Sequence, residues 1–225
     1  MMRSFCSLLI SLGAAAVHAA PPAQVELSFD VLHNGSSVAQ VRHHLQHDGR
    51  VYELNEAWSG KGLYALLGSA HRSSRGRVGE AGLRPLEYRD ERTGRRTARA
   101  RFDWQAKTVT MQYKGEPRVV PLPPDASDRL AFLFDFAFSP PPAGEVTFHL
   151  MDGRGRSRHV YEVQGTERLT TPGGQFEALR LVRRTHDEVA EIWLAVDRSY
   201  LPVRVRVTEK GGSRYDQVLM QISAP

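Results

Sequence analysis

A period-two alternation of apolar and polar residues runs through most of this chain and limits its fold more than any other feature. From Val25 to Val31 the odd positions are apolar and the even ones polar, the pattern of a strand with one buried face. The segment 95–104 alternates in the same way, with Thr97, Arg99, Arg101 and Asp103 on one face and Ala98, Ala100, Phe102 and Trp104 on the other. Further strands are indicated at 38–46, 50–58, 146–151, 160–164 and 176–183. The sequence therefore predicts an all-β protein.

Two dipeptides mark hairpins near the N-terminus. Asn34-Gly35 and Asp48-Gly49 both accept positive φ angles, as tight two-residue turns require. A tight second turn would place Glu53 opposite His44, within the cluster formed by His43, His44 and His47. A metal site is one interpretation of this cluster, but His43 and His44 point to opposite faces of a strand. Scattered surface and rim histidines are the favoured interpretation, so neither a metal nor a cofactor is predicted.

The C-terminal strands allow a register to be derived. If the loop 196–199 places Ala195 opposite Tyr200, the apolar residues of both strands meet on one face. Glu191 then lies opposite Arg204 and beside Trp193, and we predict a structural ion pair. A buried catalytic acid held by its partner is the alternative. Gly211-Gly212 is expected to close the next hairpin and to bring Val203 near Val218.

Two segments depart from the strand pattern. The stretch 61–67 is apolar, lies between glycines and is expected to form one or two helical turns. The stretch 127–138 predicts a helix that Ser127 or Asp125 caps and that three prolines, 140–142, end. Because this helix is apolar almost all round, it must be buried, and we place it on the concave side of a curved sheet. It either plugs the core, which is favoured, or forms a lid over an apolar cavity or touches a membrane. The groove of the second interpretation would be lined by Leu130, Phe132, Leu133, Phe134, Phe136 and Trp193.

The N-terminus has the pattern of a signal peptide. One charge at Arg3 is followed by an uncharged apolar run that is too short to cross a bilayer, and Val17-His18-Ala19 offers small residues to a signal peptidase. We predict residues 1–19 as the signal peptide, cleavage after Ala19, and a periplasmic single β domain over 20–225 with no transmembrane span. The only cysteine, Cys6, is lost with the signal, so the exported domain has no disulfide.

Charge and motifs exclude several functions. Without residues 1–19 the chain has 29 basic and 25 acidic residues, and a formal charge of +4 does not indicate nucleic-acid binding. Ten arginines fall between positions 72 and 101; a solvated sheet face is favoured over a basic face for anionic lipid or glycan. No phosphate-binding loop, zinc-protease helix, nucleophile elbow or Cys-x-x-Cys pair occurs. We therefore expect a protein without catalytic residues.

A sixteen-residue stretch in the C-terminal third carries a family resemblance. The segment 191–206, Glu-Ile-Trp-Leu-Ala-Val-Asp-Arg-Ser-Tyr-Leu-Pro-Val-Arg-Val-Arg, closely resembles the strand-turn-strand of bacterial domain-of-unknown-function family 3108, and the similarity extends from about Val25 to Ile222. The resemblance implies an exported envelope protein with a strongly curved antiparallel sheet that forms an open or half β-barrel. It also suggests a likeness to the half-barrels of periplasmic lipoprotein carriers, and it implies no catalytic residues.

Three roles follow, in order of preference. The first is a non-catalytic binding or carrier module with an apolar groove for a lipid-like ligand or a hydrophobic partner segment. The second is an interaction or assembly module that offers a sheet edge or the basic face to another envelope protein. An enzyme acting on envelope glycans is third, because it would need a cleft with two facing carboxylates.

Overall fold

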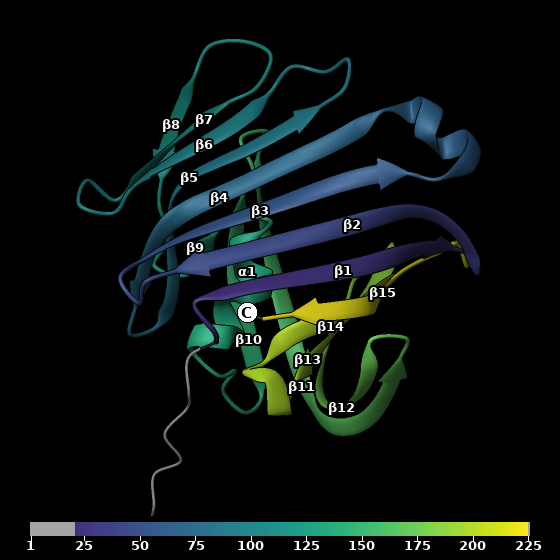
Figure 1. Cartoon of the computed structure of the whole chain (residues 1–225). Helices are drawn as coiled ribbons and strands as arrows, with labels where there is room; N and C mark the ends of the chain where they lie inside the picture. Colours follow the sequence, from purple (N-terminus) through teal and green to yellow (C-terminus); the bar gives the residue numbers. More distant parts are fainter. Residues whose placement is uncertain (1–20, 225) are drawn as a thin grey trace, which may run out of the picture.

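The fold is one long sheet that curves around a single helix (Figure 1). The computed structural model describes residues 21–224, so the predicted signal peptide and its cleavage site at Ala19 lie outside the described residues. The strands are β1 (Gln24–His33), β2 (Ser36–His47), β3 (Val51–Gly60), β4 (Ser69–Gly79), β5 (Gly82–Arg92), β6 (Ala98–Asp103), β7 (Thr108–Gln112), β8 (Arg118–Pro121), β9 (Ala126–Ser127), β10 (Glu145–Met151), β11 (Arg156–Thr171), β12 (Gly174–Arg184), β13 (Glu188–Ala195), β14 (Leu201–Glu209) and β15 (Arg214–Ser223). The helices are η1 (Gly62–Leu67), α1 (Ala131–Phe138) and η2 (Val196–Arg198).

The strand order joins two meanders into one curved sheet. Strands β1 to β8 form one meander and β10 to β15 another, and β1 pairs with β15 to join them into one sheet. All neighbours are antiparallel except β9 and β10, which are parallel. The sheet ends at β8 on one side and at β9 on the other, and α1 lies between the two halves (Figure 1). The predicted fold class, an open and strongly curved antiparallel sheet with one buried helix, is confirmed.

Helix α1 begins at Ala131, four residues after the predicted start. Residues 126 and 127 instead form β9, and the side chain of Asp128 caps the helix. Its Oδ1 accepts hydrogen bonds from the backbone N–H of Leu130, at 2.8 Å, and of Ala131, at 2.7 Å. The predicted caps, Ser127 and Asp125, are therefore wrong, because several side chains that can accept a hydrogen bond precede the apolar run.

The helix is packed on both sides, which identifies it as a core plug rather than a lid. Phe134 is buried in the cluster that β1 to β7 contribute to, where its ring lies 5.4 Å from that of His43. Phe132 and Phe136 point into a second cluster and make edge contacts with Phe148 of β10. Each half of the sheet therefore completes its core with different faces of the same helix.

The hairpin at Asp48-Gly49 is looser than predicted. His47 pairs with Tyr52 and His44 with Asn55, so Glu53 does not lie opposite His44. Only Gly49 of the dipeptide has a positive φ, and the Asp48 carboxylate accepts bonds from the N–H groups of Arg50 and Val51. This side-chain turn adds residues to the connection and shifts the register. The facing residue of His43 is thereby Glu56.

The C-terminal register is also shifted. Ser199 and Tyr200 both adopt positive φ, and Tyr200 N–H donates to the carbonyl of Ala195, so the loop includes Tyr200 and Ala195 faces Leu201. A bulge then follows at Pro202 and Val203, because proline has no N–H to give to the ladder. Arg204 consequently faces Trp193 rather than Glu191. The next hairpin pairs Arg204 with Val218, one residue away from the predicted register.

Candidate functional site

A groove lies beside α1 and is lined by both apolar and polar side chains. Its volume is about 700 Å³, within the range of small-molecule sites. Both halves of the sheet contribute to it, through the start of β5 and through β10, and the C-terminal half of α1 forms a further wall. The main apolar side chains are Leu83, Trp104, Phe136, Val146 and Phe148.

The rim of the groove is stiff. It includes Pro123, Pro124, Pro140 and Pro142, whose φ angles are fixed by their rings. Trp104 is held by a 2.7 Å hydrogen bond from its Nε1 to the carbonyl of Pro85. The groove is thus formed by the fold before any ligand enters.

Asp135 is the polar group that distinguishes this groove. It lies on α1, lines the groove, and accepts a 2.6 Å hydrogen bond at Oδ1 from the backbone N–H of Leu83. Burial against apolar neighbours raises the pKa of its carboxyl to about 7, and the bond from Leu83 only partly offsets this. Near neutral pH a fraction of the molecules therefore carries a protonated carboxyl that can donate a hydrogen bond into an apolar space.

A second hollow, of about 820 Å³, lies near the β2–β3 turn, and its wall has a different chemistry. Five charged side chains line it, namely Asp48, Glu53, Arg75, Glu87 and Arg101. It is larger than the groove beside α1 and also has apolar side chains on its wall, among them Leu86 and Phe102.

The predicted groove residues separate in the structure. Phe136 lines the groove, whereas Leu130 and Phe134 are fully buried in one core and Phe132 in the other. Leu133 is partly buried and packs against both clusters. Trp193 lies on the opposite face of β13 from Ile192 and Leu194, the residues that share a core with Phe132 and Phe136. Trp193 belongs to the same hydrophobic cluster as Leu130 and Phe134, so the predicted groove residues are mostly parts of the two cores.

Trp193 is buried in the larger hydrophobic cluster, and three arginines also lie over its ring. The guanidinium groups of Arg180, Arg204 and Arg206 lie 5.2–5.5 Å from its ring, and its Nε1 donates a 2.6 Å bond to Glu167. Such stacking over an indole stabilises both groups.

The predicted Glu191–Arg204 ion pair is wrong in its partners. Glu191 accepts from Arg180, and its carboxylate lies 3.8 Å from Arg206. Arg204 instead makes two bonds to Asp216, at 2.8 and 2.6 Å. The bulge at Val203 moves Arg204 along the strand, and so exchanges the partners within one surface network.

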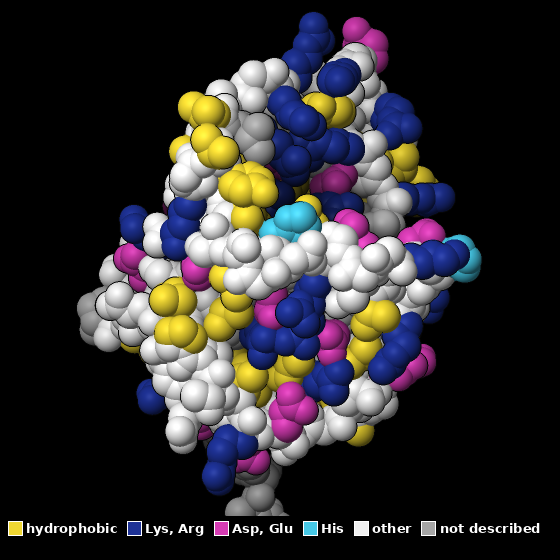
Figure 2. Space-filling view, turned by 90° about the vertical axis from the view of Figure 1, so that its right-hand side faces the viewer, with side chains coloured by type: hydrophobic (Ala, Val, Ile, Leu, Met, Phe, Trp, Pro, Cys, Tyr) yellow, Lys and Arg dark blue, Asp and Glu magenta, His cyan; other side chains and the backbone are white. Residues whose placement is uncertain are grey.

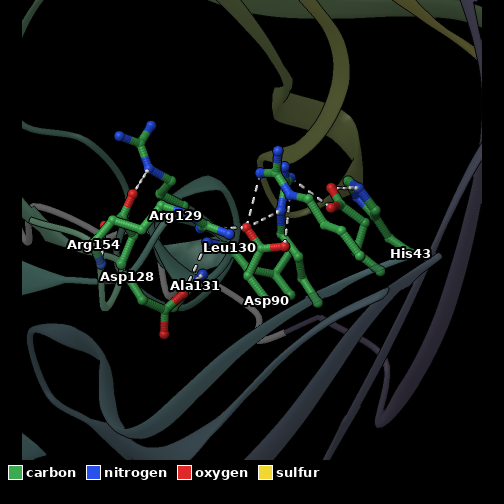
Figure 3. Close-up of polar contacts among 11 residues, drawn as sticks. His43, Asp90, Asp128, Arg129, Leu130, Ala131 and Arg154 are labelled. Atoms are coloured by element: carbon green, nitrogen blue, oxygen red, sulfur yellow. Dashed lines mark hydrogen bonds and ion pairs between the residues drawn. The ribbon is translucent and has the colours of Figure 1, made fainter. Parts of the chain in front are cut away.

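A buried row of charges crosses the inner face of the sheet, and the sequence analysis did not find it. Directly paired residues on β2, β3, β4 and β5 supply His43, Glu56, Arg72 and Asp90 in that order. His43 Nε2 lies 3.0 Å from Glu56 Oε2, and Arg72 Nη1 donates a 2.7 Å bond to Glu56 Oε1. His43, Glu56 and Asp90 are almost completely buried. Figure 3 shows His43 and Asp90 toward opposite ends of this row.

The row also connects the two halves of the sheet. Asp90 accepts two 2.9 Å bonds from Arg92 and a 2.7 Å bond from Arg154, which belongs to the β10–β11 turn (Figure 3). Burial raises the pKa of the Glu56 carboxyl, but the bond from His43 and the charge of Arg72 outweigh it, so the pKa lies below its ordinary value. The pKa of Asp90 is lowered in the same way by its arginines. Both acids are therefore ionised, and the row is a structural clamp.

One signal in the sequence could have revealed this row. The alternation places His43 between Val41 and Leu45 on the inner face of β2, and Glu56 between Leu54 and Trp58 on that of β3. Polar residues at such positions must find partners. Which partners they find depends on the register, and the side-chain turn at Asp48 changes it.

The basic segment 72–101 is divided between two faces. Arg72 and Arg92 join the buried row, whereas Arg99 and Arg101 are exposed on β6. On the outer face Glu87 accepts bonds from both Arg75 and Arg89, which neutralises part of the charge there. Among residues 21–224 no three histidine, cysteine, aspartate or glutamate side chains are grouped to hold a metal ion, and no helix is long and apolar enough to cross a membrane.

These features define a class of protein: an open, β-barrel-like sheet that curves around one helix, with a groove beside that helix. The chain belongs to the family described as "Protein of unknown function (DUF3108)", whose model matches residues 24–219. The family expected from the segment 191–206 is thus confirmed. No curated protein matches the chain in sequence.

One solved structure supports the fold, and two others are more distantly similar. The chain is similar to a β-barrel-like protein of domain-of-unknown-function family 1849 from Brucella abortus, with 8% identity over 92% of this chain and 100% of that one, at a TM-score of 0.55. A candidate exported protein with a YmcC-like fold from Bacteroides fragilis aligns at 11% identity over 91% and 100% of the two chains, with a TM-score of 0.45. A lipoprotein candidate from Parabacteroides distasonis aligns at 9% identity over 89% and 95%, with a TM-score of 0.39. At 8% identity the first of these comparisons shows a shared fold alone.

Proposed function

We propose that this protein is a non-catalytic binding module that holds an acyl chain or a similar lipid-like ligand in the groove beside α1. The observation that supports this most directly is the groove itself, about 700 Å³ in volume, with apolar side chains on its wall and the half-buried carboxyl of Asp135 beside them. An acyl chain would contact Phe136, Phe148 and Trp104, and its polar head would lie within reach of Asp135. The proposal places the protein in the cell envelope, in keeping with the apolar N-terminal segment.

The proposed role is non-catalytic because each carboxyl that lines the groove already has a hydrogen-bond partner. The titratable groups that line it are Arg84, Asp125, Asp135 and His149. Asp125 is bound to His149 through a 2.8 Å contact between Oδ1 and Nδ1, and Asp135 is bound to a backbone N–H. A binding role is compatible with these groups in their present hydrogen bonds.

The groove is tested by obstructing it. Ala81 is exposed in the β4–β5 turn and lines the groove, so Ala81→Trp adds a large ring to the mouth without disturbing a core. We expect saturable binding of a dansyl-labelled fatty acid by the parent chain, followed by fluorescence, and binding weaker by about tenfold or more in Ala81→Trp, since the lost contact area is worth one or two kcal/mol.

Ala106→Trp provides the matched control, because Ala106 is an exposed alanine in another hairpin turn. It should bind the probe as the parent chain does. Absence of saturable binding by the parent chain, or equal affinities for parent and Ala81→Trp, would overturn the proposal. Native mass spectrometry of protein purified from the periplasm should show a co-purifying lipid that Ala81→Trp loses.

The groove should also respond to pH. As pH rises through about 7, Asp135 becomes ionised and repels an anionic head group, so the affinity for the fatty acid is expected to fall. A dansyl-labelled fatty alcohol should show a smaller dependence. Asp135→Asn should remove the part of the pH dependence that belongs to Asp135; an unchanged pH profile in this variant would show that Asp135 does not cause it.

A further inference from the structure

At the far end of β3 and β4 a short apolar helix projects from the sheet (Figure 1). In η1 the side chains of Leu63 and Leu66 are 84% and 85% exposed, and that of Tyr64 is 46% exposed. Two leucines in water at adjacent turns of a projection are unusual for a protein whose other leucines are largely buried. This end of β5 is opposite to the end that lines the groove, so the projection has no part in the groove.

Basic side chains surround the same projection. The β5–β6 turn lies against the end of η1, since Ser69 N–H donates a 3.0 Å bond to Thr93 Oγ1 and an added Cβ at Gly68 would meet Thr93. Arg95 and Arg96 are exposed in that turn, and among the described residues neither takes part in an ion pair. Figure 2, which views this end of the sheet, shows apolar side chains next to a dense group of lysines and arginines.

A hollow behind the projection combines the same two properties. It has a volume of about 450 Å³ and is lined by Trp58, Tyr64 and Tyr215 together with Arg72, Arg92 and Arg95. Arg72 and Arg92 are already bound to acids of the buried row, whereas Arg95 is not. Aromatic rings beside cations are the side chains that membrane-surface segments place at the level of the lipid head groups.

We propose that η1 and the β5–β6 turn form a docking surface for an anionic lipid bilayer. Leu63 and Leu66 would enter the boundary between head groups and acyl chains, while Arg95 and Arg96 would lie against the lipid phosphates. The positive charges of Arg95 and Arg96 in the turn favour an anionic lipid surface. A six-residue projection is too small for the contact area of a stable protein interface, but it is sufficient for shallow insertion into lipid. The inference is independent of the groove.

Vesicle co-sedimentation tests the proposal with a chain that begins at Ala20, because the apolar N-terminal segment would itself bind lipid. Residues 21–224 carry the whole fifteen-stranded sheet and both hydrophobic cores, so this chain contains the fold. Vesicles of phosphatidylcholine and phosphatidylglycerol in equal parts should bind the parent chain, and vesicles of phosphatidylcholine alone should bind it much more weakly. The difference should shrink as salt is added.

Two double variants and two matched controls locate the surface. Leu63→Ser with Leu66→Ser should weaken binding about tenfold or more, and Arg95→Glu with Arg96→Glu by roughly fivefold for each arginine removed. Val51→Ser with Val119→Ser changes two exposed apolar residues elsewhere, and Arg156→Glu with Arg168→Glu two exposed arginines elsewhere. These controls should bind as the parent chain does, with unchanged circular dichroism in all variants.

Several outcomes would overturn the inference. They are equal binding of the parent chain to both kinds of vesicle, no binding to either, or controls that lose affinity as the η1 variants do. Dimerisation without vesicles that Leu63→Ser with Leu66→Ser abolishes would show that a second copy occupies the surface instead. Ala81→Trp should leave vesicle binding intact, so failure of docking and failure of the groove can be told apart.

Discussion

Replacing Glu56 with alanine is expected to lower the free energy of unfolding by about 3–5 kcal/mol, a large part of the stability of a domain of this size. Glu56 is 3% exposed and is bound to His43 on one side and Arg72 on the other. Its loss leaves a buried imidazole and a mostly buried guanidinium without their shared acid. Urea unfolding at neutral pH, followed by tryptophan fluorescence, measures the change.

Glu53→Ala is the matched control, because Glu53 lies on the same strand but is exposed on the outer face. It should change the free energy of unfolding by no more than about 0.5 kcal/mol. His43→Ala combined with Glu56→Ala should cost less than the sum of the two single changes by about 1 kcal/mol or more. If Glu56→Ala were as mild as its control, the row would not be a clamp between the strands.

The sequence predicts the fold class because each strand repeats one local rule. In β6 the buried positions 98, 100 and 102 alternate with exposed 99, 101 and 103, as the period-two pattern requires. The apolar stretch of α1 likewise predicts burial whatever its neighbours are. Such features depend on a few adjacent residues, so they can be predicted from the sequence alone.

Registers and partners are harder to predict because they depend on the details of turns. The carboxylate of Asp48 lengthens one hairpin, and this decides that His43 meets Glu56. Pro202 causes a bulge in another, and this decides that Arg204 meets Asp216. A register shift of two residues keeps the apolar residues on the same face while it changes the polar partners.

The candidate site illustrates the same difficulty at longer range. Phe136 and Asp135 come from α1, Leu83 from β5 and Phe148 from β10, so the groove exists only after both halves of the sheet have closed on the helix. An apolar helix predicts that some of its residues line a cavity if one is present. It does not predict which face remains open, because that depends on how the two cores divide the phenylalanines.

Helix capping by Asp128 makes the stability of the protein depend on pH. This carboxyl is completely buried, and burial raises its pKa to about 6 despite bonds from Ser74 and from the N–H groups of Ala131 and Leu130. In the unfolded chain its pKa is near the ordinary value of 3.8. Between these two values the folded state binds more protons than the unfolded state, so the contribution of Asp128 to stability falls as pH rises from about 4 to about 7.

Asp128→Asn is therefore expected to gain stability relative to the parent chain as pH rises. The amide keeps an oxygen for the N–H groups of Leu130 and Ala131, and its nitrogen can donate to Ser74, whose hydroxyl lies 2.9 Å from that of Tyr52. Because the amide does not ionise, the difference in unfolding free energy between variant and parent should increase by roughly 2 kcal/mol between pH 4 and pH 8. Urea titrations at several pH values measure this difference.

Asp48→Asn supplies a control of opposite sign. Bonds from the N–H groups of Val51 and Arg50 lower the pKa of the exposed Asp48 carboxyl, so its ionised form favours the folded state and the variant should gain nothing at neutral pH. Groups common to parent and variant, among them Asp135, Glu56 and Asp90, largely cancel in the Asp128 comparison. A difference for Asp128→Asn that stays the same from pH 4 to pH 8 would mean that Asp128 is not held protonated by burial, and that its capping bonds stabilise the charge fully.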